Sequence, residues 1–243
     1  MTTMKNLLIV TILWATSIPA KSQDFQGKID NYFRLSDLDS LNMTVKEIAE
    51  YNPGHHNRYL TYWEAYGLYK SSLILSEKRK EKREAEEALD KAKELLEATK
   101  LKTSEDFALL AMCYNYSLSF ANSLKVISLS SETKKLAKTA ITEDPNNLRG
   151  YLVSGMNDFY TPAIFGGKKD CEEHFLKAIA LDAHTSNNPF DPTWGKDEAY
   201  YYLVSFYASK DDDESRKKAE KFLTEALELY PDNSMLKRLR NGK

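Results

Sequence analysis

Segments with a helical pattern of apolar residues follow one another along almost the whole chain of 243 residues. From 213 to 230, apolar side chains recur three and four positions apart, and a turn that begins at Pro231 interrupts the pattern. This spacing places apolar side chains on one face of a helix, and a proline in a polar turn ends such a helix. The same pattern predicts helices over 77–99, 132–143 and 171–181. The chain has only 9 glycines and 7 prolines, which agrees with an all-α fold.

An aromatic-rich segment precedes each of these four helices. The four segments span 59–69, 107–116, 150–160 and 198–207. The chain therefore alternates a helix rich in tyrosine with a helix rich in alanine and leucine. Repetition of a helical pair is typical of a solenoid, in which stacked neighbours bury a continuous core. A helical bundle without repeats is the alternative.

The second helix of each pair, with its exit, resembles a tetratricopeptide repeat. In the last pair, the family's small, bulky, small and proline positions hold Ala219, Leu223, Ala226 and Pro231. In the preceding pair the first three positions hold Cys171, Phe175 and Ala178, while Ala183 replaces the proline. In the first helices, the small position where two helices approach closely is occupied by Gly67, Ala111 and Gly155, and by the larger Leu203.

The resemblance implies a right-handed α–α superhelix of about four to five hairpins and covers roughly residues 57–235. Residues at the small position are spaced more widely than the family's repeat of ~34 residues, so we expect degenerate, lengthened repeats. We predict three parts: a signal peptide at 1–22, capping helices at 23–56, and a tetratricopeptide-like repeat domain at 57–243.

The first 22 residues have the composition of a secretory signal peptide. Lys5 supplies a positive charge, an apolar run extends from Leu7 to Ala15, and small residues follow. The run is shorter than the ~20 residues that span a membrane, and no lipoprotein cysteine follows it. We expect cleavage after Ser22, so that the mature chain starts at Gln23, or at Ala20 as the alternative, and we expect a periplasmic or secreted protein. A buried N-terminal strand or helix is the alternative.

The balance of charges and the cysteine count restrict the classes of partner. Lys and Arg number 34 and Asp and Glu number 36, so the net charge of −2 gives no reason to expect a nucleic acid. Cys113 and Cys171 cannot by themselves form a four-thiolate zinc site or a disulfide scaffold. Export would permit a disulfide between them, whereas their apolar surroundings favour two packed thiols.

Motifs for catalysis and metal binding are missing from the sequence. It contains no zinc-protease, phosphate-loop or nucleophile-elbow motif. The pairs His55 with His56 and Cys171 with His174 offer too few ligands for a metal. We therefore predict no catalytic, cofactor-binding or metal-binding residues and no enzymatic activity. Carboxylates that meet only in the fold leave a helical hydrolase as an alternative.

Two connections between helices have unusual sequences. One contains Phe165, Gly166 and Gly167, and the other contains Trp194 and Gly195. The glycine pair allows a left-handed backbone, and the tryptophan is expected to pack against the helices. We predict structural roles for these five residues. Together the two connections resemble a group of exported bacterial repeat proteins that includes the T-component associated with TRAP transporters, which implies a periplasmic helper protein.

The first helices of tetratricopeptide-like folds line a concave face. Carrying the face positions across by this resemblance gives ten candidate groove residues: Glu64, Leu68, Met112, Asn115, Arg149, Met156, Phe159, Tyr200, Val204 and Tyr207. Such an apolar, aromatic groove would suit an extended peptide, a helix or an amphipathic small molecule. Packing between helices is the alternative role for these aromatic side chains.

We therefore expect an exported scaffold that binds a protein or peptide partner in its concave groove. We expect no cofactor, no nucleic acid partner and no membrane insertion of the mature chain. A small-ligand-binding accessory of a transporter is the alternative, and it requires a closed apolar pocket beneath Phe165 and Trp194. A helical hydrolase is the second alternative.

Overall fold

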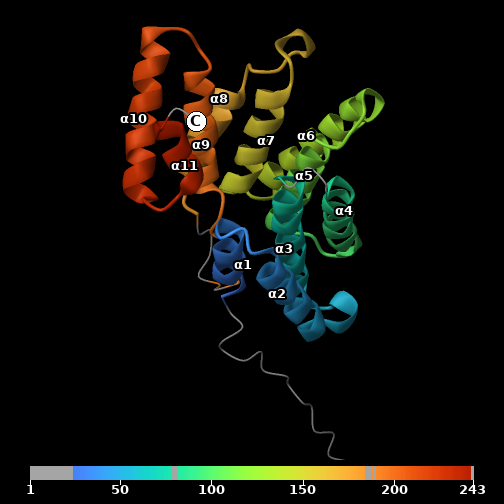
Figure 1. The fold of residues 1–243 in the computed structure, drawn as a ribbon. Helices are drawn as coiled ribbons and strands as arrows, with labels where there is room; N and C mark the ends of the chain where they lie inside the picture. The colour runs from blue at the N-terminus through green and yellow to red at the C-terminus, as the bar shows by residue number, and fades with distance from the viewer. Residues whose placement is uncertain (1–23, 78–80, 184–187, 189, 242–243) are drawn as a thin grey trace, which may run out of the picture.

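The computed structural model describes residues 24–77, 81–183, 188 and 190–241, and every regular element within these ranges is a helix (Figure 1). The N-terminal pair is α1 (Phe25–Arg34) and α2 (Leu38–Tyr51), followed by the short η2 (Pro53–His55). Four hairpins follow: α3 (Arg58–Glu77) with α4 (Lys82–Ala98), α5 (Ser104–Ser117) with α6 (Ser123–Glu143), α7 (Leu148–Tyr160) with α8 (Cys171–Ala180), and α9 (Lys196–Ala208) with α10 (Asp213–Leu229). The short η3 (Ala163–Phe165) lies between α7 and α8, and α11 (Ser234–Arg240) follows α10.

The two helices of each hairpin contact each other, and each hairpin packs against the next through two further sets of contacts. The first helices contact one another in the order α3, α5, α7, α9. The second helix of each hairpin contacts the first helix of the following one. The predicted all-α architecture of stacked, tetratricopeptide-like hairpins is therefore confirmed.

Polar residues at the helix starts explain where the elements begin. The side chain of Asn147 accepts a hydrogen bond from Gly150 N at the start of α7. Thr103 and Asp106 form a reciprocal capping box at the start of α5. Such caps satisfy amide groups that have no partner within the helix. They lie directly before the aromatic-rich segments, so the predicted first helices begin close to their expected positions.

Two helix boundaries differ from the sequence prediction. Helix α6 begins at Ser123, well before the predicted segment 132–143. The prediction missed its first turns because their apolar residues face solvent and form no buried stripe. The predicted helix over 77–99 is divided, since α3 ends at Glu77 and α4 begins at Lys82. The charged run therefore extends across a hairpin connection, part of which lies outside the described residues.

Small residues set the close approach of paired helices. A Cβ atom on Gly67 would lie 2.5 Å from Val45 of α2, and one on Gly155 would lie 2.5 Å from the Phe175 ring of α8. No real Cβ contact is this short, so both positions depend on the absence of a side chain.

The glycines of the two unusual connections have different roles. Gly166 and Gly195 have φ values of +85° and +105°, in the left-handed region that glycine tolerates. Gly167 does not have a positive φ, contrary to our expectation. Instead, a side chain there would collide with the backbone of Thr161.

Both cysteines are buried, free thiols. Burial raises the pKa of the Cys113 thiol to about 12. Burial, together with the neighbouring Asp158, raises the pKa of the Cys171 thiol to about 11. The two residues therefore pack as small apolar groups rather than forming the disulfide that export would permit.

None of the helices in the described ranges is long and apolar enough to cross a membrane. The predicted signal peptide at 1–22 lies outside these ranges.

We expect Gly155→Ala to lower the free energy of unfolding by roughly 1–3 kcal/mol, because the added methyl group overpacks the α7–α8 contact. Phe175→Leu in the same chain should recover part of this loss, since it removes the ring that the methyl group meets. Urea denaturation of the two single variants and the double variant measures the coupling. Strictly additive losses would contradict the contact.

Candidate functional site

One buried guanidinium joins three parts of the fold. The Arg149 side chain of α7 is fully buried, and its Nη2 donates to Oε1 of Glu105 on α5 at 2.7 Å. The same guanidinium donates to the carbonyl oxygens of Trp194 at 2.8 Å, Pro192 at 3.0 Å and Ala183 at 3.3 Å. Burial alone lowers the pKa of Arg149, but the Glu105 carboxylate outweighs it and the net direction is upward. Arg149 therefore stays charged and fixes the connection that leads to α9.

Trp194 transmits this constraint to α3. Its indole Nε1 donates to the Tyr62 hydroxyl at 2.9 Å, and its ring stacks on Tyr66 with centroids 5.3 Å apart. Trp63 also donates to the Phe190 carbonyl oxygen at 3.2 Å. The connection before α9 is thus held against a helix more than a hundred positions earlier in the chain.

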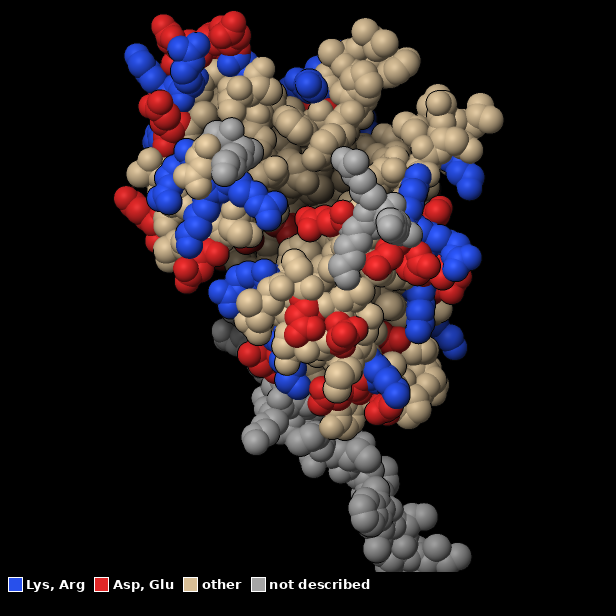
Figure 2. Space-filling model, viewed as in Figure 1, with Lys and Arg blue, Asp and Glu red and all other residues tan. Residues whose placement is uncertain are grey.

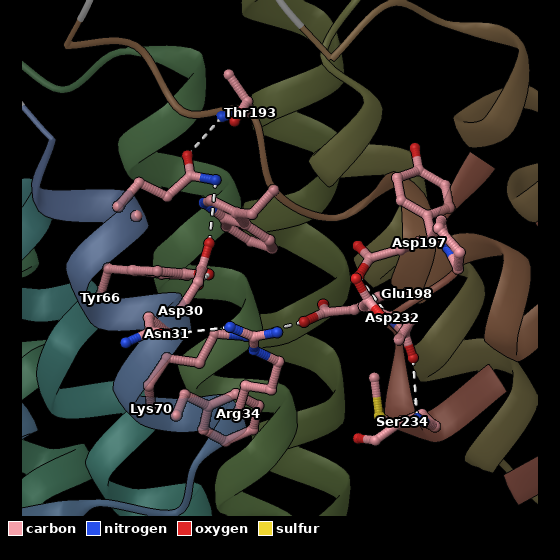
Figure 3. Close-up of a pocket in the computed structure, with 18 residues that line it drawn as sticks. Asp30, Asn31, Arg34, Tyr66, Lys70, Thr193, Asp197, Glu198, Asp232 and Ser234 are labelled. Atoms are coloured by element: carbon pink, nitrogen blue, oxygen red, sulfur yellow. Dashed lines mark hydrogen bonds and ion pairs between the residues drawn. The ribbon is translucent and has the colours of Figure 1, made fainter. Parts of the chain in front are cut away.

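A cleft of about 560 Å³ lies beside this connection (Figure 3). Figure 3 shows side chains of α1 and α3 facing those from the start of α9 and the α10–α11 turn. Its charged lining residues are Asp30, Arg34, Lys70, Asp197, Glu198 and Asp232, and its aromatic ones are Phe33, Tyr66, Trp194 and Tyr230.

Lys70 is the buried cation of the cleft. Its Nζ lies 2.9 Å from Oε1 of Glu198 and 4.6 Å from the centre of the Phe33 ring. Burial lowers the pKa of Lys70, but Glu198 and Asp30 more than compensate, so the net direction is upward. The Lys70–Glu198 ion pair therefore links α3 directly to α9.

Two further carboxyl groups make the cleft acidic. Burial raises the pKa of Asp30, which accepts hydrogen bonds from the Tyr66 hydroxyl at 2.7 Å and from Gln26 at 3.1 Å. Burial and the neighbouring Glu198 raise the pKa of Asp197, which accepts from the Asn233 amide at 2.8 Å. Carboxylates outnumber cations in the lining, so the cleft disfavours an anionic ligand.

Aromatic rings extend from the cleft along the first helices. Tyr69 of α3 meets Tyr116 of α5 edge to face at 6.0 Å, and Tyr116 meets Phe120 at 5.5 Å. Burial, then Glu198 and then the Tyr202 phenol raise the pKa of Tyr69 well above its ordinary value. Tyr69 therefore lies within electrostatic reach of Glu198 in the cleft and of Tyr202 on α9.

A second set of rings continues on α7 and α9. Tyr202 lies 6.0 Å from Tyr160 and 6.1 Å from Phe159, measured between ring centres. We use the name aromatic trough for these two sets of rings taken together: Tyr69, Tyr116, Phe120, Phe159, Tyr160 and Tyr202. Figure 2 shows a hollow with mostly uncharged atoms over α7 in the same view.

Two projections with exposed apolar side chains stand at one end of the molecule. At the start of α6, Leu124 is 89% exposed and Ile127 is 78% exposed. In η3, Ile164 is 86% exposed and Phe165 is 76% exposed. Both projections carry uncharged surface in Figure 2. We call these four side chains the apolar projections; exposed groups of this kind mark interaction sites.

The predicted groove residues are mostly buried. Phe159 is half-buried in the aromatic trough, and the others are buried: Glu64, Leu68, Met112, Asn115, Arg149, Met156, Tyr200, Val204 and Tyr207. The Tyr207 hydroxyl donates to Glu172 of α8 at 2.7 Å, and the Tyr200 hydroxyl donates to Glu225 of α10. Contact of these ten residues with a partner stays a prediction.

Sequence reasoning missed most of the aromatic trough. Tyr116, Tyr160 and Tyr202 lie within the predicted aromatic-rich segments, but their exposure depends on how each helix is rotated about its axis. That rotation is set by packing against neighbouring hairpins. The aromatic composition was the available signal, and it did not separate exposed rings from buried ones.

A second pocket, of about 740 Å³, lies between η2 and the end of α4. Nδ1 of His55 lies 3.3 Å from Oε2 of Glu64, and that buried oxygen accepts no hydrogen bond from any residue in the described ranges. Burial raises the pKa of Glu64, whereas His55 and Lys91 oppose the shift. Across the described parts of the chain, no group of three His, Cys, Asp or Glu side chains could hold a metal ion.

Comparison with known proteins identifies a fold rather than a family. No protein-family model matches the chain, and no curated protein matches its sequence. The HusA haemophore from Porphyromonas gingivalis is 23% identical with a TM-score of 0.59, over 82% of this chain and 97% of that protein. YrrB, a TPR protein with an unusual peptide-binding site, is 14% identical with a TM-score of 0.41, over 90% of this chain and 99% of its own. The first likeness shows a shared fold; the resemblance to the T-component group stays a prediction.

We expect Arg149→Met to lower the free energy of unfolding by about 3–5 kcal/mol, because it leaves the Glu105 carboxylate and three carbonyl oxygens without their buried donor. Arg149→Lys should recover little, since an ammonium cannot reproduce the forked contacts. Urea denaturation followed by tryptophan fluorescence measures both. The exposed Arg216→Met is the control and should change stability by less than about 1 kcal/mol. Similar losses in both methionine variants would be evidence against the role of Arg149.

We expect Asp197→Asn to raise the melting temperature at pH 7. The folded protein holds the Asp197 proton more tightly than the unfolded chain does, so its contribution to stability falls as pH rises from 3.8 through the raised pKa. The amide keeps an acceptor for Asn233 and removes the buried charge. Thermal melts from pH 3 to pH 8 should show the advantage at neutral pH and its loss below the ordinary carboxyl pKa. Asp182→Asn, at an exposed carboxylate, is the control; an advantage that does not change with pH would contradict this linkage.

Proposed function

We propose that the protein is an exported, non-enzymatic binding protein that takes up a flat apolar compound of the haem and porphyrin class in the aromatic trough. The apolar projections carry this proposal. Four large aliphatic or aromatic side chains stand in water at one end of the molecule. Covering them with an apolar ligand removes that surface from water, which favours binding by ~25 cal/mol per Å².

The fold of the HusA haemophore supports this class of ligand. The likeness extends over most of both chains, and the other protein is named as a haemophore. The predicted signal peptide supports export, which a protein collecting an extracellular ligand requires.

The shape of the site favours an open trough over a closed pocket. The small-ligand alternative requires a closed pocket beneath Phe165 and Trp194, but within the described residues Phe165 is exposed while Trp194 is buried and lines the acidic cleft. Partly exposed rings such as Tyr116 and Tyr202 present faces and edges on which a ring compound can stack. A large flat ligand therefore suits this surface better than a small enclosed one.

The acidic cleft is the place where a hydrolase would have its carboxylates. Asp30 and Asp197 have raised pKa values, as a general acid requires. However, both accept hydrogen bonds from neighbouring side chains, and Glu198 is paired with Lys70. We assign these groups a structural role, joining α1, α3, α9 and the α10–α11 turn.

A peptide partner is the second candidate, favoured by Asn115. Its side-chain oxygen is buried on α5 and has no hydrogen-bond partner among the described residues. A peptide amide would satisfy this acceptor. This is the partner class that the sequence predicted for the concave groove.

We expect hemin to bind the mature protein with a shift of its Soret absorption and with quenching of tryptophan fluorescence. The double variant Ile164→Ser/Phe165→Ser should weaken binding roughly tenfold or more, because it removes apolar contact area without disturbing the core. The double variant Leu35→Ser/Met43→Ser removes similar exposed groups from the N-terminal pair and should bind as the unaltered protein does. Equal affinity in all three proteins, or capture of a peptide with no hemin binding, would refute the ring-compound proposal.

A further inference from the structure

His55 occupies a backbone conformation that side chains rarely adopt. Its φ is +53°, and it follows Gly54 with a φ of +74°, so two successive residues of η2 are left-handed. A residue with a Cβ is strained in this region, whereas glycine is not. Strain of this kind is concentrated at functional sites. The turn before α3, which carries the pair His55 and His56, is therefore a candidate for ligand binding.

The buried side chain of Asn52 holds this turn in place. Its Nδ2 donates to the Thr61 hydroxyl at 2.9 Å and to the Asn57 carbonyl oxygen at 3.1 Å, and its Oδ1 accepts from the Asn57 amide at 2.8 Å. The carbonyl oxygen of Asn52 also accepts from the His55 amide at 2.9 Å. Because Thr61 belongs to α3, these bonds close the turn and fix it to that helix. The two histidines are therefore exposed but carried by a well-fixed segment.

A buried carboxylate lies behind His55. The Glu64 side chain is 2% exposed, and its Oε2 lies 3.3 Å from Nδ1 of His55. No residue in the described ranges donates a hydrogen bond to that oxygen. A buried acceptor without a donor is costly, and a protonated imidazole donates from both ring nitrogens. His55 can therefore serve Glu64 through Nδ1 and a ligand through Nε2.

The pocket of about 740 Å³ beside this turn carries an excess of positive charge. Its volume lies within the ~300–1,000 Å³ of small-molecule sites. Glu94 is the one acidic lining residue among those that the structure describes. The basic lining residues are His55, His56, Arg58, Lys91 and Lys100. The pocket therefore attracts an anion, in contrast to the acidic cleft.

Two of these cations surround the same buried carboxylate. Lys91 of α4 and His55 of η2 both oppose the upward shift of the Glu64 pKa that burial causes. Lys91 is exposed, whereas Arg58 is already paired with the Asp106 carboxylate at 3.6 Å. His55 and Lys91 therefore approach one point of the fold from different elements, within a single pocket.

An apolar surface adjoins these charges on α4. Residues at spacings of three and four share one face of a helix, and the pocket is lined by such a set on α4: Lys91, Glu94, Leu95 and Ala98. Leu101 follows the helix, lines the same pocket and is 84% exposed. An exposed leucine at the edge of a pocket suits the hydrocarbon part of a ligand.

We propose that the pocket between η2 and α4 binds an amphipathic organic anion, separately from the ligand of the aromatic trough. The carboxylate or phosphate head of this anion accepts a hydrogen bond from Nε2 of His55 and pairs with Lys91. Its hydrocarbon body covers Leu95 and Leu101. Glu64 is a positioning residue, since it holds the imidazole through Nδ1. Hydrogen bonds between charged groups are stronger than neutral ones, so the head supplies much of the affinity.

Octanoate, octyl phosphate and octanol test this inference, because they share a hydrocarbon chain and differ in the head. Isothermal titration calorimetry with the mature protein should show both anions binding roughly tenfold or more tightly than octanol. The tighter of the two anions identifies the head as a carboxylate or a phosphate.

Two substitutions locate the anion in this pocket. His55→Asn removes the imidazole with a residue that tolerates the left-handed region, and Lys91→Ala removes the ammonium from an exposed helix position. The double variant should bind both anions roughly tenfold or more weakly and octanol as before. Lys91→Ala alone should weaken the anions without lowering the melting temperature. Lys138→Ala, at an exposed lysine on α6, is the control and should leave every affinity unchanged.

Glu94→Gln gives the opposite prediction, which misfolding cannot imitate. It removes the acidic charge from the lining, so both anions should bind severalfold more tightly while octanol binds as before. Anions that bind no better than octanol, an unchanged anion affinity in the double variant, or no gain with Glu94→Gln would each overturn the inference. Hemin binding does not use this pocket, so these outcomes leave the proposed function intact.

Discussion

The buried guanidinium of Arg149 is the interaction on which the rest of the structure depends. It satisfies the Glu105 carboxylate and three carbonyl oxygens of the connection before α9. The described residues of that connection form no helix or strand that could pair these groups, and buried carbonyl oxygens without donors are costly. With the connection fixed, Trp194 packs on α3 and Glu198 reaches Lys70. The acidic cleft and one side of the aromatic trough both follow from that placement.

The local parts of this fold could be predicted from the sequence because helix periodicity and capping are local signals. The first helices of the hairpins and α10 lie close to the predicted segments for this reason. The start of α6 and the short α11 were missed, because the first carries exposed apolar residues and the second is only a few residues long. Sequence periodicity detects a long stripe of buried apolar residues along a helix, and neither segment has such a stripe.

The candidate site could not be predicted in the same way, because it depends on contacts between distant parts of the chain. Lys70 and Glu198 are 128 positions apart, and neither lies in a motif. Arg149 was expected in the groove, yet packing turns it into the core between α5, α7 and the connection to α9. Likewise, the left-handed φ of Lys168 is imposed by a turn whose sequence drew attention only to its glycines.

The buried, paired charges and the apolar projections lie in different parts of the fold. In the acidic cleft, charged groups are buried and paired, so they hold α3 to α9 and offer little to a ligand. At the start of α6 and between α7 and α8, the apolar projections stand in water. A protein retains such costly features against the general trend of burial and pairing where they are used in binding. This separation explains how the chain can keep the left-handed Lys168 and the exposed Ile164 and Phe165 in one connection: the hairpins that carry it are stabilised elsewhere, by Arg149 and by the core.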